Sequence, residues 1–125
     1  MYFGKYKKSY VSCFACGVNW QTHEEKMTDV NIATELLTDA FQDRFDVAVM
    51  VSGDSDLSPP IQKVRELFPT KKIIMAFPPN RRTNQLCKIA HETMTIDRHV
   101  LDRCQLPDQV TTQTGFVVCR PAKWK

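Results

Sequence analysis

Two aspartates, Asp54 and Asp56, follow an apolar run in the stretch VAVMVSGDSDLSPP, residues 47 to 60. Like charges this close repel each other, so a sequence that keeps them together usually has a cation between them or abundant water around them. Carboxylate oxygens are the ligands that magnesium and manganese prefer. A divalent ion held there would orient water and stabilise negative charge on a phosphate. The pair therefore indicates either a hard-cation site or a solvated turn.

The two aspartates should lie at the carboxyl end of a strand. Residues 47–51 are apolar at every position, which is typical of a strand covered on both faces of a parallel sheet. Ligands of such sheets collect outside the carboxyl ends of the strands. Gly53 lets the backbone bend there, and side chains two residues apart, such as Asp54 and Asp56, can point the same way.

Three interpretations of this turn remain open. In the first, one aspartate caps the following helix while the other is solvated. In the second, Asp54 to Ser58 approximates the Asp-x-Ser-x-Ser loop of adhesion-type metal sites, with Asp56 in place of the first serine. In the third, Asp29, at the head of a preceding helix, reaches the same edge and completes a site of three carboxylates.

The pattern around these residues predicts alternating helices and strands. Apolar residues recur at three- and four-residue steps after Thr28, and Pro59 and Pro60 suit the first turn of a second helix. The expected helices are residues 28–42, 59–68, 84–92 and 97–104, and the expected strands are residues 47–51, 73–77 and 93–96. Strand, helix and strand in this order form a βαβ unit, so the predicted fold class is α/β with a parallel sheet.

Both ends of the chain lack a clear period. We therefore expect residues 1–27 to be a separate N-terminal segment, residues 28–106 to be the core, and residues 107–125 to be an irregular tail. A length of 125 residues fits one core. No apolar run approaches the roughly 20 residues of a membrane span, so we expect a soluble protein with no membrane partner.

Five cysteines, with no secretory signal before them, predict a cytoplasmic protein with mostly free thiols. Cys13 and Cys16, followed directly by Gly17, resemble half of a zinc knuckle, in which a tight turn brings two thiolates to one ion. A closed zinc site takes four ligands, for which the candidates are His23, Cys87, Cys104 and Cys119. A redox pair and two ordinary free thiols are the alternatives.

Basic residues stand on either side of an acidic middle. The net charge is only +3, from 17 lysines and arginines against 14 aspartates and glutamates, which by itself does not identify a polyanionic partner. An acidic centre between basic loops suits a metal site with a phosphate path beside it, and solvated surface charges are the commoner explanation. Near the N-terminus, tyrosines alternate with lysines, an arrangement that suits single-stranded RNA or simple packing.

The run from Glu24 to Glu66, EEKMTDVNIATELLTDAFQDRFDVAVMVSGDSDLSPPIQKVRE, resembles the NYN domain family of PIN-like nucleases. It matches the family's Glu-Lys-x-x-Asp-Val helix start and its strand followed by Ser-Gly-Asp-Ser-Asp, in the same order. The resemblance implies a three-layer, Rossmann-like PIN fold and cleavage of RNA with magnesium or manganese. The residues implied as catalytic metal ligands are Asp29, Asp54 and Asp56, and those implied as contacts to RNA are Arg81, Arg82 and Ser52.

One part of the family pattern has no counterpart in this sequence. Domains of the family begin with an apolar strand that ends in an aspartate, and no aspartate precedes Asp29 here. We therefore expect a core that is incomplete at its N-terminus and that exposes apolar flanks of the remaining sheet. Packing of two chains as a homodimer would cover these flanks. The alternative function is a catalytically impaired module of the same fold that binds RNA or a protein.

Overall fold

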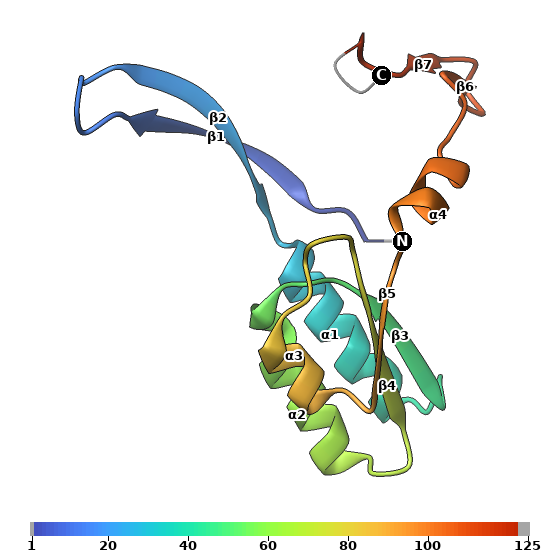
Figure 1. Ribbon diagram of the computed structural model, residues 1–125. Helices are drawn as coiled ribbons and strands as arrows, with labels where there is room; N and C mark the ends of the chain where they lie inside the picture. Colours follow the sequence, from blue (N-terminus) through green and yellow to red (C-terminus); the bar gives the residue numbers. More distant parts are fainter. Residues whose placement is uncertain (1, 123–125) are drawn as a thin grey trace.

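The chain folds into an α/β body, with a two-stranded arm before it and a small hairpin after it (Figure 1). The structure is a computed structural model that describes residues 2–122. Its strands are β1 (Lys5–Ser12), β2 (Asn19–Lys26), β3 (Val47–Val51), β4 (Lys72–Phe77), β5 (Glu92–Thr95), β6 (Gln109–Thr111) and β7 (Val117–Cys119). Its helices are α1 (Thr28–Phe41), α2 (Ser58–Leu67), α3 (Asn84–Ile89) and α4 (Arg98–Arg103), with a 3-10 turn at Ser55–Leu57. We call α1 through β5 the body and β1–β2 the arm.

The body is built on three parallel strands in the order β3-β4-β5. Met50 of β3 lies opposite Met75 of β4, and Phe77 of β4 lies opposite Thr95 of β5. The helix α2 connects β3 to β4, and α3 connects β4 to β5. The predicted α/β class with a parallel sheet is therefore confirmed.

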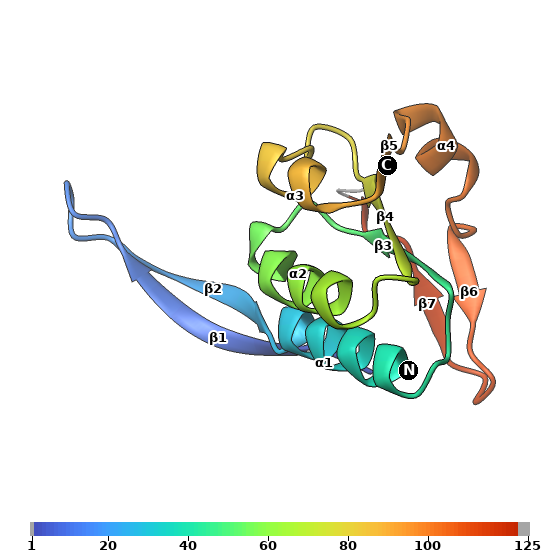
Figure 2. The same ribbon diagram turned by 90° about the horizontal axis from the view of Figure 1, so that it is seen from below.

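The hydrophobic core lies between the sheet and helices α1, α2 and α3, which stand on one side of the strands in both views (Figures 1 and 2). Side chains at i, i+3 and i+4 spacing on each helix face the strands, because that spacing places them on one face. The core consists of Leu36, Ala40, Met50, Leu57, Ile61, Val64, Ile73, Met75, Phe77, Leu86 and Ile89.

The strand β3 is covered on one face only. Its Ala48 and Met50 face the core, whereas Val47, Val49 and Val51 are 48%, 58% and 60% exposed. The expectation that this strand is covered on both faces is wrong, because the helices pack against one side of the sheet. Val47, Val49 and Val51 therefore leave an apolar face of this strand exposed.

Regular structure also occurs at both ends of the chain, where the sequence shows no period. In the arm, β1 and β2 pair with each other in antiparallel register from Lys5 opposite Lys26 to Ser12 opposite Asn19. The strands β6 and β7 form a second antiparallel hairpin in the segment expected to be irregular. Neither hairpin joins the central sheet. Between residues 2 and 122, no helix is long and apolar enough to cross a membrane.

Candidate functional site

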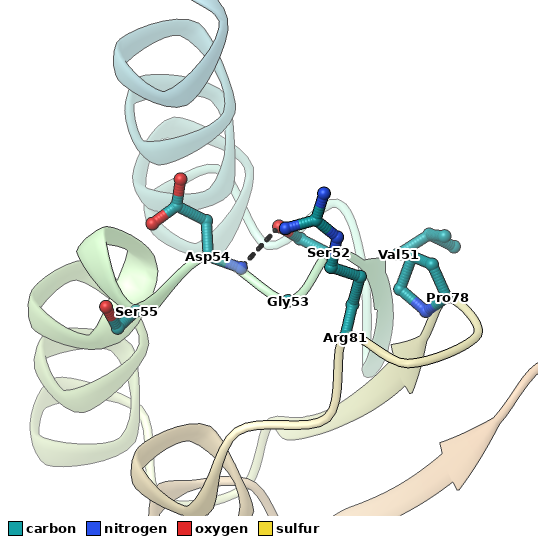
Figure 3. A pocket seen from close by; sticks show the side chains of 7 residues that line it. All are labelled: Val51, Ser52, Gly53, Asp54, Ser55, Pro78 and Arg81. Carbon is teal, nitrogen blue, oxygen red and sulfur yellow. Dashed lines mark hydrogen bonds between the residues drawn. The ribbon is translucent and has the colours of Figure 1, made fainter.

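Two turns meet at the carboxyl edge of the central sheet (Figure 3). One follows β3 and the other follows β4, as expected for neighbouring parallel strands, whose carboxyl ends lie at the same edge. Between them lies a cavity of about 550 Å³. The residues that line it are Val51, Ser52, Gly53, Asp54, Ser55, Pro78 and Arg81.

Gly53 allows the two turns to approach each other. A Cβ atom at this position would collide with the carbonyl oxygen of Arg81 and would lie 2.7 Å from the Arg81 Cβ. Only glycine lets two backbones pass this closely without displacement. The glycine of the Ser-Gly-Asp-Ser-Asp motif is therefore needed for packing, and it holds Arg81 beside the motif.

Asp54 combines a structural role with exposure. Its Oδ1 accepts a hydrogen bond from the backbone amide of Asp56 at 3.0 Å, so it caps the 3-10 turn at Ser55–Leu57. The amide of Asp54 in turn donates to the Ser52 hydroxyl at 3.1 Å. The predicted capping role is therefore confirmed for Asp54. The residue remains exposed, and its carboxylate points toward α1 (Figure 3).

Asp29 lies in the first turn of α1 and comes within electrostatic reach of the motif. Partial desolvation raises the pKa of Asp29 above its ordinary value, and the negative charges of Asp54, Asp56 and Glu25 raise it further. Asp29, at the start of α1, therefore lies near enough to Asp54 and Asp56, which follow β3, for their charges to interact. The helix N-terminus offsets part of this repulsion, because its dipole favours negative charge.

The donor atoms at this edge suit magnesium or manganese, which take oxygen ligands. Among the ion pairs of residues 2–122, none involves Asp29, Asp54 or Asp56, so their charges are not neutralised by a basic side chain. Within the same residues, no three histidine, cysteine, aspartate or glutamate side chains are gathered closely enough to hold a metal ion. Over the described part of the chain, the edge therefore carries unpaired carboxylates of the kind that bind magnesium or manganese, but it is not a preformed metal site.

The two predicted arginines have different surroundings. Arg81 is exposed and lines the cavity. Arg82 donates to the hydroxyls of Thr93 and Thr95 at 3.0 Å and 3.5 Å, and its guanidinium lies 5.6 Å from the centre of the Phe77 ring. Arg82 therefore ties the turn to β5, while Arg81 faces the space in which a ligand would lie.

Sequence reasoning missed the pairing of the two turns across the cavity. Pro78 and Ser55 line the cavity beside the expected Ser52 and Arg81. Two signals could have joined these turns. The strand-helix-strand order places both turns at the carboxyl edge of one sheet, and Gly53 of the motif allows a close approach of another backbone.

Cys13 and Cys16 lie in the turn that joins β1 to β2. The amide of Gly17 donates to the Cys13 carbonyl at 2.8 Å, and the amide of Cys13 donates to the Val18 carbonyl at 2.9 Å. Hydrogen bonds from the amides of Cys16 and Ala15, and from the Cys16 side chain, lower the pKa of the Cys13 thiol.

None of the candidate third and fourth zinc ligands lies beside this pair. His23 stands opposite Lys8, four positions along β2 from Asn19, which is the first residue of that strand. The other candidates belong to different parts of the fold, namely Cys87 in α3, Cys104 after α4 and Cys119 in β7. The described part of one chain therefore offers this turn two thiols and no third ligand.

The body is a parallel α/β sheet in which Asp54 and Asp56 directly follow the strand β3. The NYN domain family matches residues 5–97, and the chain is a member of that family. The match includes the arm as well as the body, and it confirms the resemblance seen in residues 24–66.

Two similar proteins extend this comparison. One is 6-hydroxy-3-succinoylpyridine 3-monooxygenase HspA of Pseudomonas putida, 30% identical over 105 residues that cover 81% of this chain and 33% of that protein. The other is the crystal structure of VPA0982 from Vibrio parahaemolyticus, a protein of unknown function, with 26% identity and a TM-score of 0.50 over 56% of this chain and 41% of that one. The chain thus spans about a third of the length of the curated relative.

Proposed function

We propose that this chain carries the metal-binding edge of a ribonuclease that hydrolyses RNA phosphodiester bonds with magnesium or manganese. The supporting observations are the position of Asp54 and Asp56 at the carboxyl end of β3 and the interaction of their charges with Asp29 of α1. The chain also belongs to a family of PIN-like nucleases, for which metal-dependent hydrolysis of RNA is the expected reaction.

Asp29, Asp54 and Asp56 would hold the ion. Magnesium is usually bound by one or two carboxylates and keeps several waters, so a hydrated ion does not require a preformed cage of three. When bound, a divalent ion supplies activation of water and stabilisation of charge on the phosphate. The hydrogen bonds of Asp54 to Asp56 and Ser52 fix the turn and leave the carboxylate exposed toward α1.

Arg81 would bind the RNA backbone from the opposite wall of the cavity. It is exposed and is held against Gly53 by close packing of the two turns. Ser52 lines the same cavity and would offer its hydroxyl to a phosphate oxygen. With a net charge of only +3, we expect RNA affinity to fall with rising salt by a slope of only a few counterions.

A cleavage assay on labelled single-stranded RNA tests this function. We expect cleavage that depends on added manganese or magnesium and that falls by at least about 100-fold in Asp54→Asn, because loss of one carboxylate from a metal site removes several kcal/mol of transition-state stabilisation. Asp102→Asn, in the exposed helix α4, is the matched control and should cleave like the parent chain. Equal cleavage by Asp54→Asn and the parent chain would refute the proposal.

A calorimetric manganese titration separates binding from catalysis. We expect saturable binding to the parent chain and its loss in Asp54→Asn. Binding without cleavage would favour the second candidate, a module of the same fold that binds RNA or a protein without cutting it. One observation favours that candidate, since Asp54 Oδ1 is already engaged by the Asp56 amide.

A further inference from the structure

The turn at the end of the arm combines two cysteines at the spacing of a metal knuckle with a hydrogen-bonded backbone turn. Cys13 and Cys16 are three residues apart, and the amide of Gly17 closes the turn onto the Cys13 carbonyl at 2.8 Å. Gly17 has φ of +71°, a left-handed conformation that glycine adopts at little cost. This arrangement places both thiols on one short loop, as in structural zinc sites with two cysteines at this spacing. We call residues 13–18 the tip.

The tip is free to meet another molecule. Each strand of the arm has eight residues, so at about 3.3 Å per residue the arm is about 25 Å long. In Figures 1 and 2 the arm extends away from the body, and the tip lies on the side opposite to α4, β6 and β7. Cys16 is exposed, and Cys13 is partly exposed.

The tip also exposes apolar side chains next to the thiols. Phe14 has its whole side chain in water, and Val18 is 58% exposed. These two side chains lie four residues apart on one projecting turn, so together they form a small uncovered apolar surface. The same few residues therefore combine two metal-binding atoms with an uncovered apolar surface.

The tip supplies fewer ligands than a closed zinc site needs. A closed zinc site takes four, and the described residues of one chain bring two thiols to the tip. From these observations we propose that the tip binds zinc and that the ion is shared by two copies of the chain, each of which contributes Cys13 and Cys16. On binding, each thiol releases its proton to solvent and the four sulfurs surround one ion.

This contact would join two chains through their arms and not through their sheets. Phe14 and Val18 of one tip would be buried against those of the other, which removes their apolar surface from water. The bodies would remain separate, with both acidic edges open. The proposal does not rest on ribonuclease activity, and it can fail or succeed independently of it.

Zinc titration of the reduced chain, followed by analytical ultracentrifugation, tests this inference. We expect half an equivalent of zinc per chain, a shift from monomer to dimer, and reversal by a chelator. Cobalt in place of zinc should give the visible absorption of tetrahedral thiolate coordination. Cys16→Ser should abolish zinc binding, dimerisation and the cobalt absorption, with an unchanged circular dichroism spectrum as evidence that the body is folded.

The double variant Cys104→Ser/Cys119→Ser is the matched control, because it removes two exposed thiols far from the tip and should dimerise with zinc like the parent chain. Loss of the zinc-linked dimer in this control would assign the metal to other residues and overturn the proposal. One zinc per monomeric chain would overturn the sharing of the site. No zinc binding by the reduced parent chain would overturn the site itself.

Discussion

The body and the arm of this molecule are stabilised in different ways. Ile61, Val64 and Phe77 of the body have no exposed surface, whereas β1 and β2 contain no buried residue. Burial of apolar surface is the dominant favourable contribution to folding, and an isolated two-stranded hairpin is marginally stable in water. The body can therefore hold a site in place by packing, whereas the arm needs a partner or a ligand to become equally ordered.

The largest effect expected from this difference is on core packing. Phe77→Ala should lower the free energy of unfolding by about 3–5 kcal/mol, because it removes a fully buried ring and leaves a cavity. Tyr10→Ala, at an exposed position of the arm, should change it by no more than about 0.5 kcal/mol. Urea unfolding followed by circular dichroism at a helix-sensitive wavelength measures both, because all the helices lie outside the arm. Equal losses in the two variants would show that the arm is part of the core.

The same difference explains which elements the sequence predicts. The helix expected at residues 28–42 is observed at Thr28–Phe41, and the strand expected at residues 47–51 is observed at those residues. Periodicity reports which side chains are buried, so it works for the body. The arm and the β6–β7 hairpin bury almost nothing, and their hydrogen bonds leave no periodic trace in the sequence. The division of the chain into three segments stays a prediction.

In the candidate site, the sequence likewise predicts the positions of some residues and not of others. The position of Asp54 and Asp56 at the sheet edge follows from the strand before them, and the placement of Asp29 was open because it depends on how α1 packs. The contact of Gly53 with Arg81 joins residues 28 positions apart and needs the parallel pairing of β3 and β4. The ties of Arg82 to β5 depend on the same tertiary arrangement.

A smaller effect is expected from glycine substitutions in the two regions. Gly53→Ala forces its Cβ into the backbone of Arg81, and overpacking of this kind costs about 1–3 kcal/mol. Gly17→Ala meets no atom within 4 Å and is strained only by its positive φ. Because the arm can open without the body, Gly17→Ala should leave the global unfolding transition unchanged.

Urea unfolding and hydrogen exchange separate these two outcomes. Gly53→Ala should shift the midpoint of unfolding, displace Arg81 and reduce RNA cleavage. Gly17→Ala should increase exchange only at the amides of the arm. A shift of the global midpoint by Gly17→Ala as large as that by Gly53→Ala would contradict the independence of the arm.

The smallest effect concerns two carboxylates whose pKa values move in opposite directions. Desolvation and the charges of Asp54 and Asp56 raise the pKa of Asp29 in the body, whereas hydrogen bonds from Lys26 and Ser9 lower the pKa of Glu24 in the arm. A carboxyl whose pKa is raised on folding binds more protons in the folded state, so its contribution to stability falls as the pH rises through that range. Glu24 has the opposite sign, and its contribution is lost as the pH falls.

Asp29→Asn should therefore stabilise the metal-free chain at pH 7, because it removes a charge that the folded state disfavours. The residue is exposed, so the gain should stay below about 0.5 kcal/mol, and it should vanish toward pH 3, where the carboxyl is protonated in both states. Glu24→Gln removes the same unit of charge and should give no gain, since Glu24 is paired with Lys26 at 2.9 Å. Thermal unfolding between pH 3 and 7 checks both variants. An equal gain in stability in both variants would show that the effect comes from net charge. If the body carboxylates bind manganese, the ion should stabilise the parent chain more than Asp29→Asn and so reverse the advantage of that variant.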